Sequence, residues 1–512
     1  MKEKPVQHLI EDTSVDTTAA PSDDDAKRLE SLGYKQEFDR EISLFVQAGF
    51  AFSCMGVLPN WLVGFAGTMN AGGPMSLFWG FVVVAPFVTL IALAMSELFS
   101  AFPVNGGVYS WCYLLSSPEW GPLMSWICGY IFLAGQLSTA MTLAYSLGEY
   151  IIATWNIANT YQIDNQGANI GIYVAVLILG ITVNACGLKF NAWLNRVMIG
   201  WVTIGTLIIV IATPLMAPTH PSGKWVFSEF QNYTGWDNVG LVFLLGMSQA
   251  GWCLIGYENG AHLAEGTRNA SRSGPFGILF SIVGAVVQAL VLCIGTLFSI
   301  QDVKELQESS FPVATLFLRA TNREMAVFFL VIVTVTQFGC LCNIMLAEAQ
   351  LMWSMSRDKC MPYHHFWYKL HSKRRIPLRI MILQAFICAI VILPSLGSKV
   401  YWSAIMSTAI ICINVSYGLP YVCRLIWSRD KLPKGPFNLG RWSIPINIAA
   451  VTWVVFFSVV LCFPSTNPVN PITMNWSCLM VGAAFLLSLV FWFTYGREHY
   501  QGPVQTLQGD SK

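Results

Sequence analysis

Twelve long apolar runs occupy the chain between residues 43 and 495, and they constrain its fold more than any other feature. Each run can cross the roughly 30 Å hydrocarbon core of a bilayer, which takes about 20 helical residues. Their approximate cores are 43–68, 76–99, 122–152, 168–187, 196–217, 239–264, 276–299, 325–356, 377–395, 401–427, 443–464 and 473–495. Charged residues make up only 11% of the chain, so lipid has to cover much of its surface. A transmembrane β-barrel would alternate polar and apolar residues, so the sequence predicts an all-α membrane protein with twelve transmembrane helices.

Lysine and arginine fall mainly on one side of the membrane when these spans are threaded with the N-terminus in the cytoplasm. That side holds 24 of them and the other side holds five, which together are the 29 in the chain. The five are Lys224, Lys304, Arg319, Arg323 and Lys399. Because cytoplasmic loops are enriched in Lys and Arg, the sequence predicts that both termini are cytoplasmic.

Polar segments flank the membrane region. Residues 1–40 contain the run Asp23-Asp24-Asp25 and have no apolar start, so we expect a disordered cytoplasmic tail rather than a cleavable signal peptide. Residues 41–500 form the twelve-helix domain, and residues 501–512 form a short cytoplasmic C-terminal tail.

The first and sixth spans carry residues that interrupt a helix. The first contains Gly56 followed by Pro59, and the sixth contains Gly246, Gly251, Gly256 and Gly260. Matched Gly and Pro positions five spans apart predict a five-plus-five inverted repeat with broken helices 1 and 6 that line a site near the membrane midplane. Repeat one would cover about 43–217 and repeat two about 239–427, with two extra helices over 443–495. Gly and Pro are also common in membrane helices that bind nothing, which is the alternative.

The sixth span also carries a family resemblance. The segment 252–258, Trp-Cys-Leu-Ile-Gly-Tyr-Glu, followed by His-Leu-Ala-Glu at 262–265 and by Pro275, resembles the sixth helix of the amino acid/polyamine/organocation superfamily. The closest likeness is to its amino acid/choline transporter branch, the fungal and plant permeases for γ-aminobutyrate (GABA), choline and amino acids. Further segments of this resemblance, in order along the chain, lie at 32–35, 72–74, 97–109, 356–362 and 435–440. It implies the inverted-repeat fold with two trailing helices, and the transport of amino acids or related amines.

Glu258 is the sharpest candidate for a functional residue. A carboxylate inside an apolar span is costly and marks a functional site by default. It can bind a substrate ammonium or carry a proton, and a structural salt bridge is the alternative. The resembling permeases usually have Asp here, so the longer Glu leaves the substrate open. His262 is a second candidate for proton coupling, because it lies four residues further on and would face Glu258 if the helix is intact; the alternative is an ordinary hydrogen-bonded residue.

Further candidate substrate-binding residues come from the first, third, sixth and eighth spans. Trp252 matches an aromatic gating position of bacterial relatives and can also cradle an ammonium, with core packing as the alternative. The amides of Gln136 and Asn343 should turn inward, toward either a ligand or another helix. The full candidate set is Ser53, Cys54, Met55, Gly56, Gln136, Trp252, Ile255, Glu258 and Asn259.

Charges near the cytoplasmic helix ends suggest an inner gate. Glu97, Arg357 and Asp358 fit charge pairs that lock such a gate, and they fit solvated anchors equally well. Two glycosylation sequons, at Asn232 and Asn475, fall on the outer side in this topology.

Several other functions are weighed against transport. The spans hold no HExxH zinc pair and no nucleophile with an evident base, which argues against a membrane enzyme, and nothing suggests a cofactor, a metal site or nucleic-acid binding. A transporter-like nutrient sensor usually has a longer cytoplasmic extension. A choline-type or thiamine-type organic cation remains the alternative cargo. No GxxxxGK[ST] P-loop is present, so a gradient or exchange drives transport, and protons are the expected coupling ion. The plasma membrane is the expected location, with the vacuole or another internal membrane as the alternative.

Overall fold

The structure, a computed structural model, describes residues 42–503 except residues 310, 373, 398, 430–431 and 472. The predicted tail 1–40 and residues 504–512 therefore lie outside the described residues. The described residues form helices and two isolated β-bridges, and twelve of the helical segments are long and apolar enough to cross a membrane. The prediction of an all-α chain with twelve membrane spans is confirmed.

The spans are numbered 1 to 12 in chain order. They are span 1, α2 (Leu44–Met55) and α3 (Val57–Asn70); span 2, α4 (Gly73–Ala101); span 3, α6 (Gly121–Ala158); span 4, α7 (Gln166–Asn184); span 5, α8 (Leu188–Met216); span 6, α10 (Val239–Gly246), α11 (Ser248–Cys253) and the 3-10 helix η2 (Tyr257–Gly266); span 7, α12 (Ala270–Leu297); span 8, α15 (Arg323–Arg357); span 9, α17 (Leu378–Val391) and η3 (Leu393–Leu396); span 10, α18 (Lys399–Trp427); span 11, η4 (Gly440–Trp442) and α19 (Ser443–Cys462); and span 12, α20 (Ser477–Phe491), η5 (Trp492–Gly496) and α21 (Arg497–His499). Shorter helices in the connections are α5 (Val108–Leu115), α9 (Gly223–Ser228), α13 (Val303–Glu308), α14 (Pro312–Ala320) and α16 (His364–Trp367).

Two spans begin at least six residues before their predicted apolar cores. Span 5 begins at Leu188 rather than 196, and span 7 begins at Ala270 rather than 276. The extra turns contain polar residues that an apolar run leaves out, such as Asn191 and Ser271, yet both of these side chains are buried. Asn191 donates its amide hydrogen to the Gly187 carbonyl oxygen at 3.0 Å, so this polar residue is satisfied inside the helix and does not end it.

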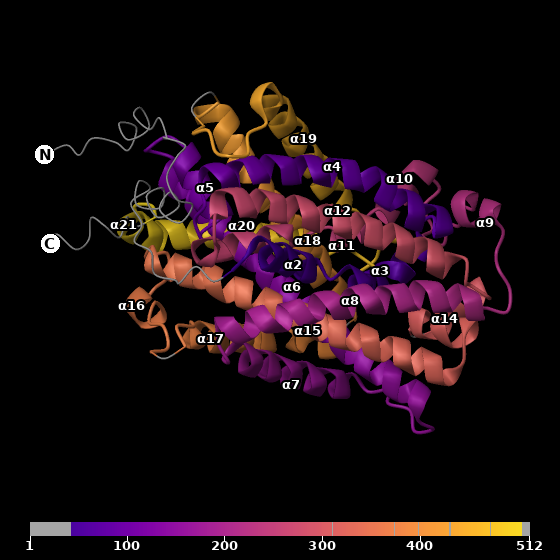
Figure 1. Cartoon of the computed structure of the whole chain (residues 1–512). Coiled ribbons are helices and arrows are strands. Elements are labelled where there is room, and N and C mark those ends of the chain that lie inside the picture. The colour runs from indigo at the N-terminus through magenta and orange to yellow at the C-terminus, as the bar shows by residue number, and fades with distance from the viewer. Residues whose placement is uncertain are drawn as a thin grey trace, which may run out of the picture.

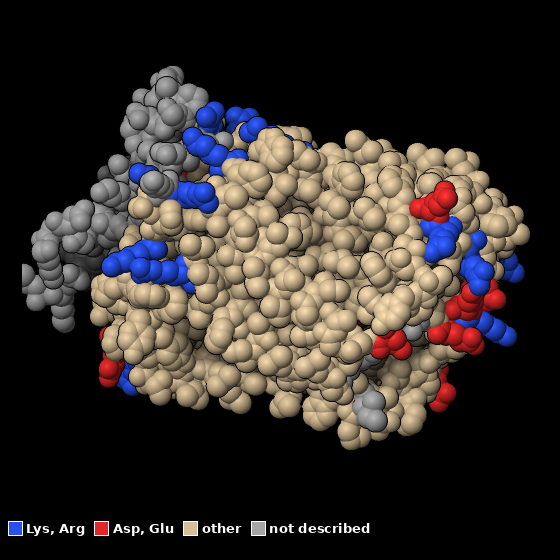
Figure 2. All heavy atoms as spheres, turned by 90° about the horizontal axis from the view of Figure 1, so that it is seen from below, with Lys and Arg blue, Asp and Glu red and all other residues tan. Residues whose placement is uncertain are grey.

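The bundle has one basic end. The long helices run roughly side by side, with α5, α16 and α21 at one end and α9 and α14 at the other (Figure 1). Lys and Arg gather at the end that holds α5, α16 and α21, which we call the basic end, while the opposite end mixes both signs of charge (Figure 2). Between them lies an uncharged belt (Figure 2), and exposed apolar side chains such as Ile204 of α8 and Leu486 of α20 occur in the interior of the long helices. A belt of this kind suits the hydrocarbon core of a bilayer.

The two halves of the chain are paired around spans 1 and 6. At one end of the pair, Ile42 bridges Thr267, and at the other end Ala71 bridges Asn232, so the two spans are tied together at both ends. Corresponding spans of the two halves also pack on each other, with α4 on α12 and α6 on α15. This is the arrangement that the inverted repeat predicts. The trailing helices α19 and α20 pack outside this group, on α4, α6 and α18.

Candidate substrate site

Span 1 is interrupted at one residue. Helix α2 ends at Met55, α3 begins at Val57, and Gly56 between them has φ 49° and ψ 45°, a left-handed conformation that favours glycine. A Cβ atom on Gly56 would lie only 2.7 Å from the Cys340 sulfur of span 8. Pro59 sits in the first turn of α3, where its missing N–H breaks no helical hydrogen bond. The predicted break in helix 1 is confirmed.

Span 6 is interrupted over a longer stretch. Helix α11 ends at Cys253, and Gly256 has φ 100° before the chain continues as the 3-10 helix η2. This helix is 10 residues long, whereas 3-10 runs longer than about four residues are uncommon and often mark a functional hinge. The predicted break in helix 6 is also confirmed.

The two breaks touch. A Cβ atom on Gly256 would lie 3.3 Å from the Cys54 carbonyl oxygen, so glycine allows the two backbones to approach closely. One turn further along η2, the Gln47 amide donates to the Gly260 carbonyl oxygen at 3.2 Å. The structure thus brings the span 1 candidates Ser53, Cys54, Met55 and Gly56 together with the span 6 candidates Ile255, Glu258 and Asn259, all of them buried.

Glu258 lies in the first turn of η2, directly after the break in span 6. The Gln136 side-chain amide donates to one Glu258 carboxylate oxygen at 3.0 Å and to the Asn259 side-chain oxygen at 2.8 Å. The Tyr417 hydroxyl of span 10 donates to the other carboxylate oxygen, and the same hydroxyl oxygen accepts the Gly256 N–H at 3.3 Å. Three spans therefore converge on one acid.

Glu258 forms no salt bridge with any of the described residues. Its side chain is 1% exposed, so in this conformation the acid is sealed from solvent and neutral donors alone hold it. Donors of this kind stabilise the ionised form of a carboxylate, which is the form that attracts a cation. Sequence reasoning named Gln136 but missed Tyr417, whose position between Ser416 and Gly418 in an apolar span was the available signal.

Asn343 belongs to a polar contact behind the break in span 1. Its amide donates to the Ser53 hydroxyl oxygen at 2.9 Å and to the Asn195 side-chain oxygen of span 5 at 2.7 Å. Asn343 thus joins three spans and positions the end of α2. Trp252 is buried on α11, and its indole N–H has no acceptor among the described residues.

His262 does not face Glu258. In a 3-10 helix the fourth residue on is turned by roughly 120°, so the condition of an intact α-helix is not met. The His262 Nδ1 lies 2.9 Å from the Asn105 carbonyl oxygen, and its ring stacks on Phe132 with centroids 5.4 Å apart. The two proton-coupling candidates therefore have separate surroundings.

The three gate candidates fall into two buried clusters near the basic end. In the first, Arg357 lies 3.3 Å from the Glu265 carboxylate of span 6 and 3.4 Å from the Asp358 carboxylate, which also accepts from the Tyr109 hydroxyl at 2.8 Å. This cluster connects span 8 with span 6 and α5. Sequence reasoning did not give Glu265 this role.

The second cluster is centred on Glu97 of span 2. Its carboxylate lies 2.7 Å from Arg424 of span 10 and accepts from the Ser443 hydroxyl and from the Leu439 N–H, the latter at 3.1 Å. Glu97 therefore pairs with a different partner from Arg357 and Asp358. Both clusters join different spans of the bundle near the basic end.

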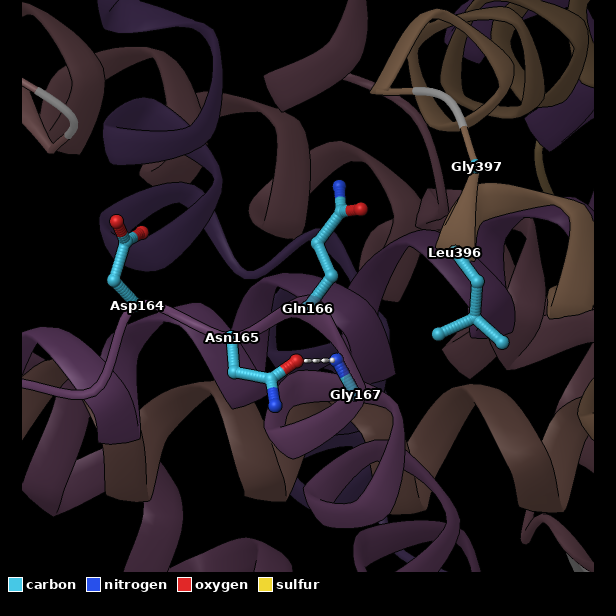
Figure 3. A pocket seen from close by; sticks show the side chains of 6 residues that line it. All are labelled: Asp164, Asn165, Gln166, Gly167, Leu396 and Gly397. Carbon is cyan, nitrogen blue, oxygen red and sulfur yellow. Dashed lines mark hydrogen bonds between the residues drawn. The ribbon is translucent and has the colours of Figure 1, made fainter.

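An open cleft lies away from the breaks, at the opposite end. It runs between the segment that leads into span 4 and the end of span 9, with Asp164 and Gln166 on one side and Leu396 on the other (Figure 3). In this cleft the Asn165 side-chain oxygen accepts a hydrogen bond from the Gly167 N–H at 2.8 Å and caps the N-terminus of α7. Asn165 therefore stabilises the start of this helix.

The two sequons also lie at the opposite end. The Asn232 side chain is exposed, whereas the Asn475 amide donates to the Leu461 carbonyl oxygen at 2.7 Å and packs against the end of span 11. Glycosylation at either position stays a prediction, and the exposure favours Asn232.

The protein is a bundle of twelve apolar spans, and two of these spans are broken helices that meet beside a buried acid. This combination is typical of a helical membrane transporter. The chain belongs to the amino acid permease family, whose model matches residues 42–485. It is 30% identical over 499 residues to a rice protein named amino-acid permease BAT1 homolog, with 94% of this chain and 96% of the relative covered. It is 27% identical to Arabidopsis thaliana amino-acid permease BAT1, with 94% and 96% covered, and 28% identical to Neurospora crassa amino-acid permease 2, with 93% and 89% covered. The resemblance stated from the sequence is confirmed, and the chain is a multi-pass membrane protein that transports amino acids.

Proposed function

We propose that this permease binds its amino acid between the two broken spans, with the substrate ammonium on Glu258. The observation that carries the proposal is a buried carboxylate, held by Gln136 and Tyr417 and without a cation among the described residues, next to the break in span 1. The first N–H groups of α3 and η2 have no helical partner and mark the positive ends of helix dipoles, so they suit the substrate carboxylate. Cys54, Met55, Trp252 and Ile255 would complete the walls of the site.

We further propose that protons drive transport and that the basic end faces the cytoplasm. One buried carboxyl group that alternates between a protonated and an ionised form is sufficient for proton coupling. The Arg357–Glu265 and Glu97–Arg424 pairs would hold the cytoplasmic side closed in the conformation described, and substrate release would require both to separate. GABA carries both an ammonium and a carboxylate, so it fits the same proposal.

Cells that lack their own amino acid permeases are expected to accumulate labelled amino acids when they express this chain. Excess unlabelled amino acid should compete, and excess choline should not, because choline lacks a carboxylate and its quaternary ammonium cannot donate a hydrogen bond to Glu258. Cells that carry an empty vector provide the control. Uptake of labelled choline, inhibited by choline more strongly than by amino acids, would favour the organic-cation alternative, which the nearby rings of Tyr257 and Tyr417 could serve.

Two exposed cysteines give a test of orientation and location. Cys186 follows α7 at the basic end, and Cys478 lies in the first turn of α20 at the opposite end. In variants that keep a single cysteine, a membrane-impermeant maleimide should label Cys478 on intact cells and Cys186 only after permeabilisation. A variant that keeps only the buried Cys293 is the control and should stay unlabelled. The reverse pattern would contradict the orientation, and labelling of both only after permeabilisation would place the protein in an internal membrane.

A further inference from the structure

A second buried acid, Glu348, lies in span 8 away from the two breaks. Its side chain is 0% exposed, and the Gln384 side-chain amide of span 9, also 0% exposed, donates to one of its oxygens at 2.5 Å. Asn343, five residues earlier on the same helix, contacts span 1, and five residues turn an α-helix by roughly 140°. Glu348 therefore belongs to the face of span 8 that packs on spans 4 and 9.

No cation compensates Glu348 among the described residues. The titratable groups that face it from the neighbouring helices are the Tyr173 hydroxyl of span 4 and the Cys388 thiol of span 9. Neither is a base, and the Tyr173 hydroxyl is occupied, since it donates to the Cys388 carbonyl oxygen at 2.9 Å. An ionised carboxylate is strongly disfavoured in such a place, because it would be buried without a partner of opposite charge.

The hydrogen bonds around Glu348 also fit a neutral acid. Its second carboxyl oxygen and the Gln384 side-chain oxygen are both buried and have no donor among the described residues. A proton on the carboxyl group adds the donor that this acid and amide pair lacks, whereas an ionised carboxylate adds only acceptors. Glu258 differs, because Gln136 and Tyr417 direct donors at both of its oxygens and so stabilise its ionised form.

We propose that Glu348 is the binding site for the transported proton, while Glu258 stays ionised and holds the substrate ammonium. This inference rests on the proposed proton-coupled function. Span 8 ends at Arg357, nine residues or roughly 13 Å beyond Glu348, in the cluster that closes the basic end. When that cluster separates, water reaches this part of span 8, the Glu348 O–H bond breaks, and the proton passes to water. The carboxylate takes up a proton again from water when the opposite side opens.

The test compares wild type with Glu348→Gln in sealed proteoliposomes. One assay measures the exchange of a radiolabelled mixture of proteinogenic amino acids, with equal pH on both sides of the vesicle membrane. The other follows accumulation of the same mixture under an inward proton gradient, together with proton entry reported by a trapped pH-sensitive dye. Glutamine resembles a permanently protonated Glu348 and can pair with Gln384, so we expect exchange near the wild-type rate and the loss of both proton entry and accumulation.

Three outcomes would overturn the inference, and one further variant supports it. Glu348→Gln protein that keeps proton entry and accumulation would show that Glu348 carries no transported proton. Failure of Glu348→Gln to fold would contradict a neutral Glu348, because the new amide has the shape of a protonated carboxyl group and can form the same pair with Gln384. Glu348→Asp keeps an acid and should restore part of the accumulation, which a merely structural role would not predict. Proton entry is measured first with the wild-type protein. If the wild type exchanges amino acids without any proton entry, the proposed proton coupling itself is wrong.

Discussion

Replacement of Gly256 by leucine is expected to abolish transport. Gly256 has φ 100°, a conformation that disfavours side chains, and a Cβ atom there would lie 3.3 Å from the Cys54 carbonyl oxygen. The contact is with backbone, which cannot rotate away as a side chain would. The larger residue therefore has to force the two breaks apart and displace the adjacent Glu258. We expect uptake of labelled amino acids to fall to the level of cells without the permease.

Gly440 supplies the matched control. It also has a positive φ, 56°, but no atom lies within 4 Å of a Cβ built on it, and it belongs to span 11 outside the repeat. Gly440→Leu therefore tests the cost of backbone conformation without the contact between spans, and uptake should remain. Gly56→Leu should behave like Gly256→Leu, because its Cβ would lie 2.7 Å from the Cys340 sulfur. Folding is checked by size-exclusion chromatography, and wild-type uptake by folded Gly256→Leu would contradict a site between the breaks.

The membrane spans could be predicted from the sequence because their signal is local. An apolar run of about 20 residues has few alternatives to a membrane helix, and Gly56 and Gly256 mark the breaks directly. The starts of spans 5 and 7 were predicted too late in the chain, because polar residues such as Asn191 and Ser271 look like the end of an apolar run. Tertiary packing buries both of these side chains. Burial depends on neighbouring helices, which an apolar count does not include.

The partners of the site residues were harder to predict because they come from distant spans. The pairing of Tyr417 with Glu258 joins residues 159 positions apart, and that of Arg424 with Glu97 joins residues 327 positions apart. Placing His262 depended on the type of helix, since only a 3-10 helix turns it away from Glu258. Sequence alone could therefore name Glu258 as an unusual acid, but it could not show which donors contact its carboxylate.

Glu258→Gln is expected to weaken apparent substrate affinity by roughly 10-fold to 100-fold. Hydrogen bonds to charged groups contribute about 1.5 to 3 kcal/mol, and every 1.4 kcal/mol is about tenfold in affinity. Glutamine keeps the size of the side chain and can still accept from Gln136, but its NH2 group would face the Tyr417 hydroxyl, so the change removes the negative charge and one acceptor. The measurement is the concentration dependence of amino acid exchange in proteoliposomes. Glu119→Gln, the same chemical change on an exposed side chain, is the control and should leave affinity unaltered.

The affinity of Glu258→Gln also decides between the two buried acids. If Glu258 binds the ammonium and Glu348 carries the proton, loss of the Glu258 charge should weaken affinity at every pH, and the proton-driven accumulation that remains should need more substrate. Unchanged affinity and exchange, with accumulation lost, would instead assign the proton to Glu258. Such a result would contradict the division of roles, because the donors from Gln136 and Tyr417 would then have to release a carboxylate that they are placed to keep charged. Normal affinity together with normal accumulation would mean that Glu258 serves only to join spans 3, 6 and 10.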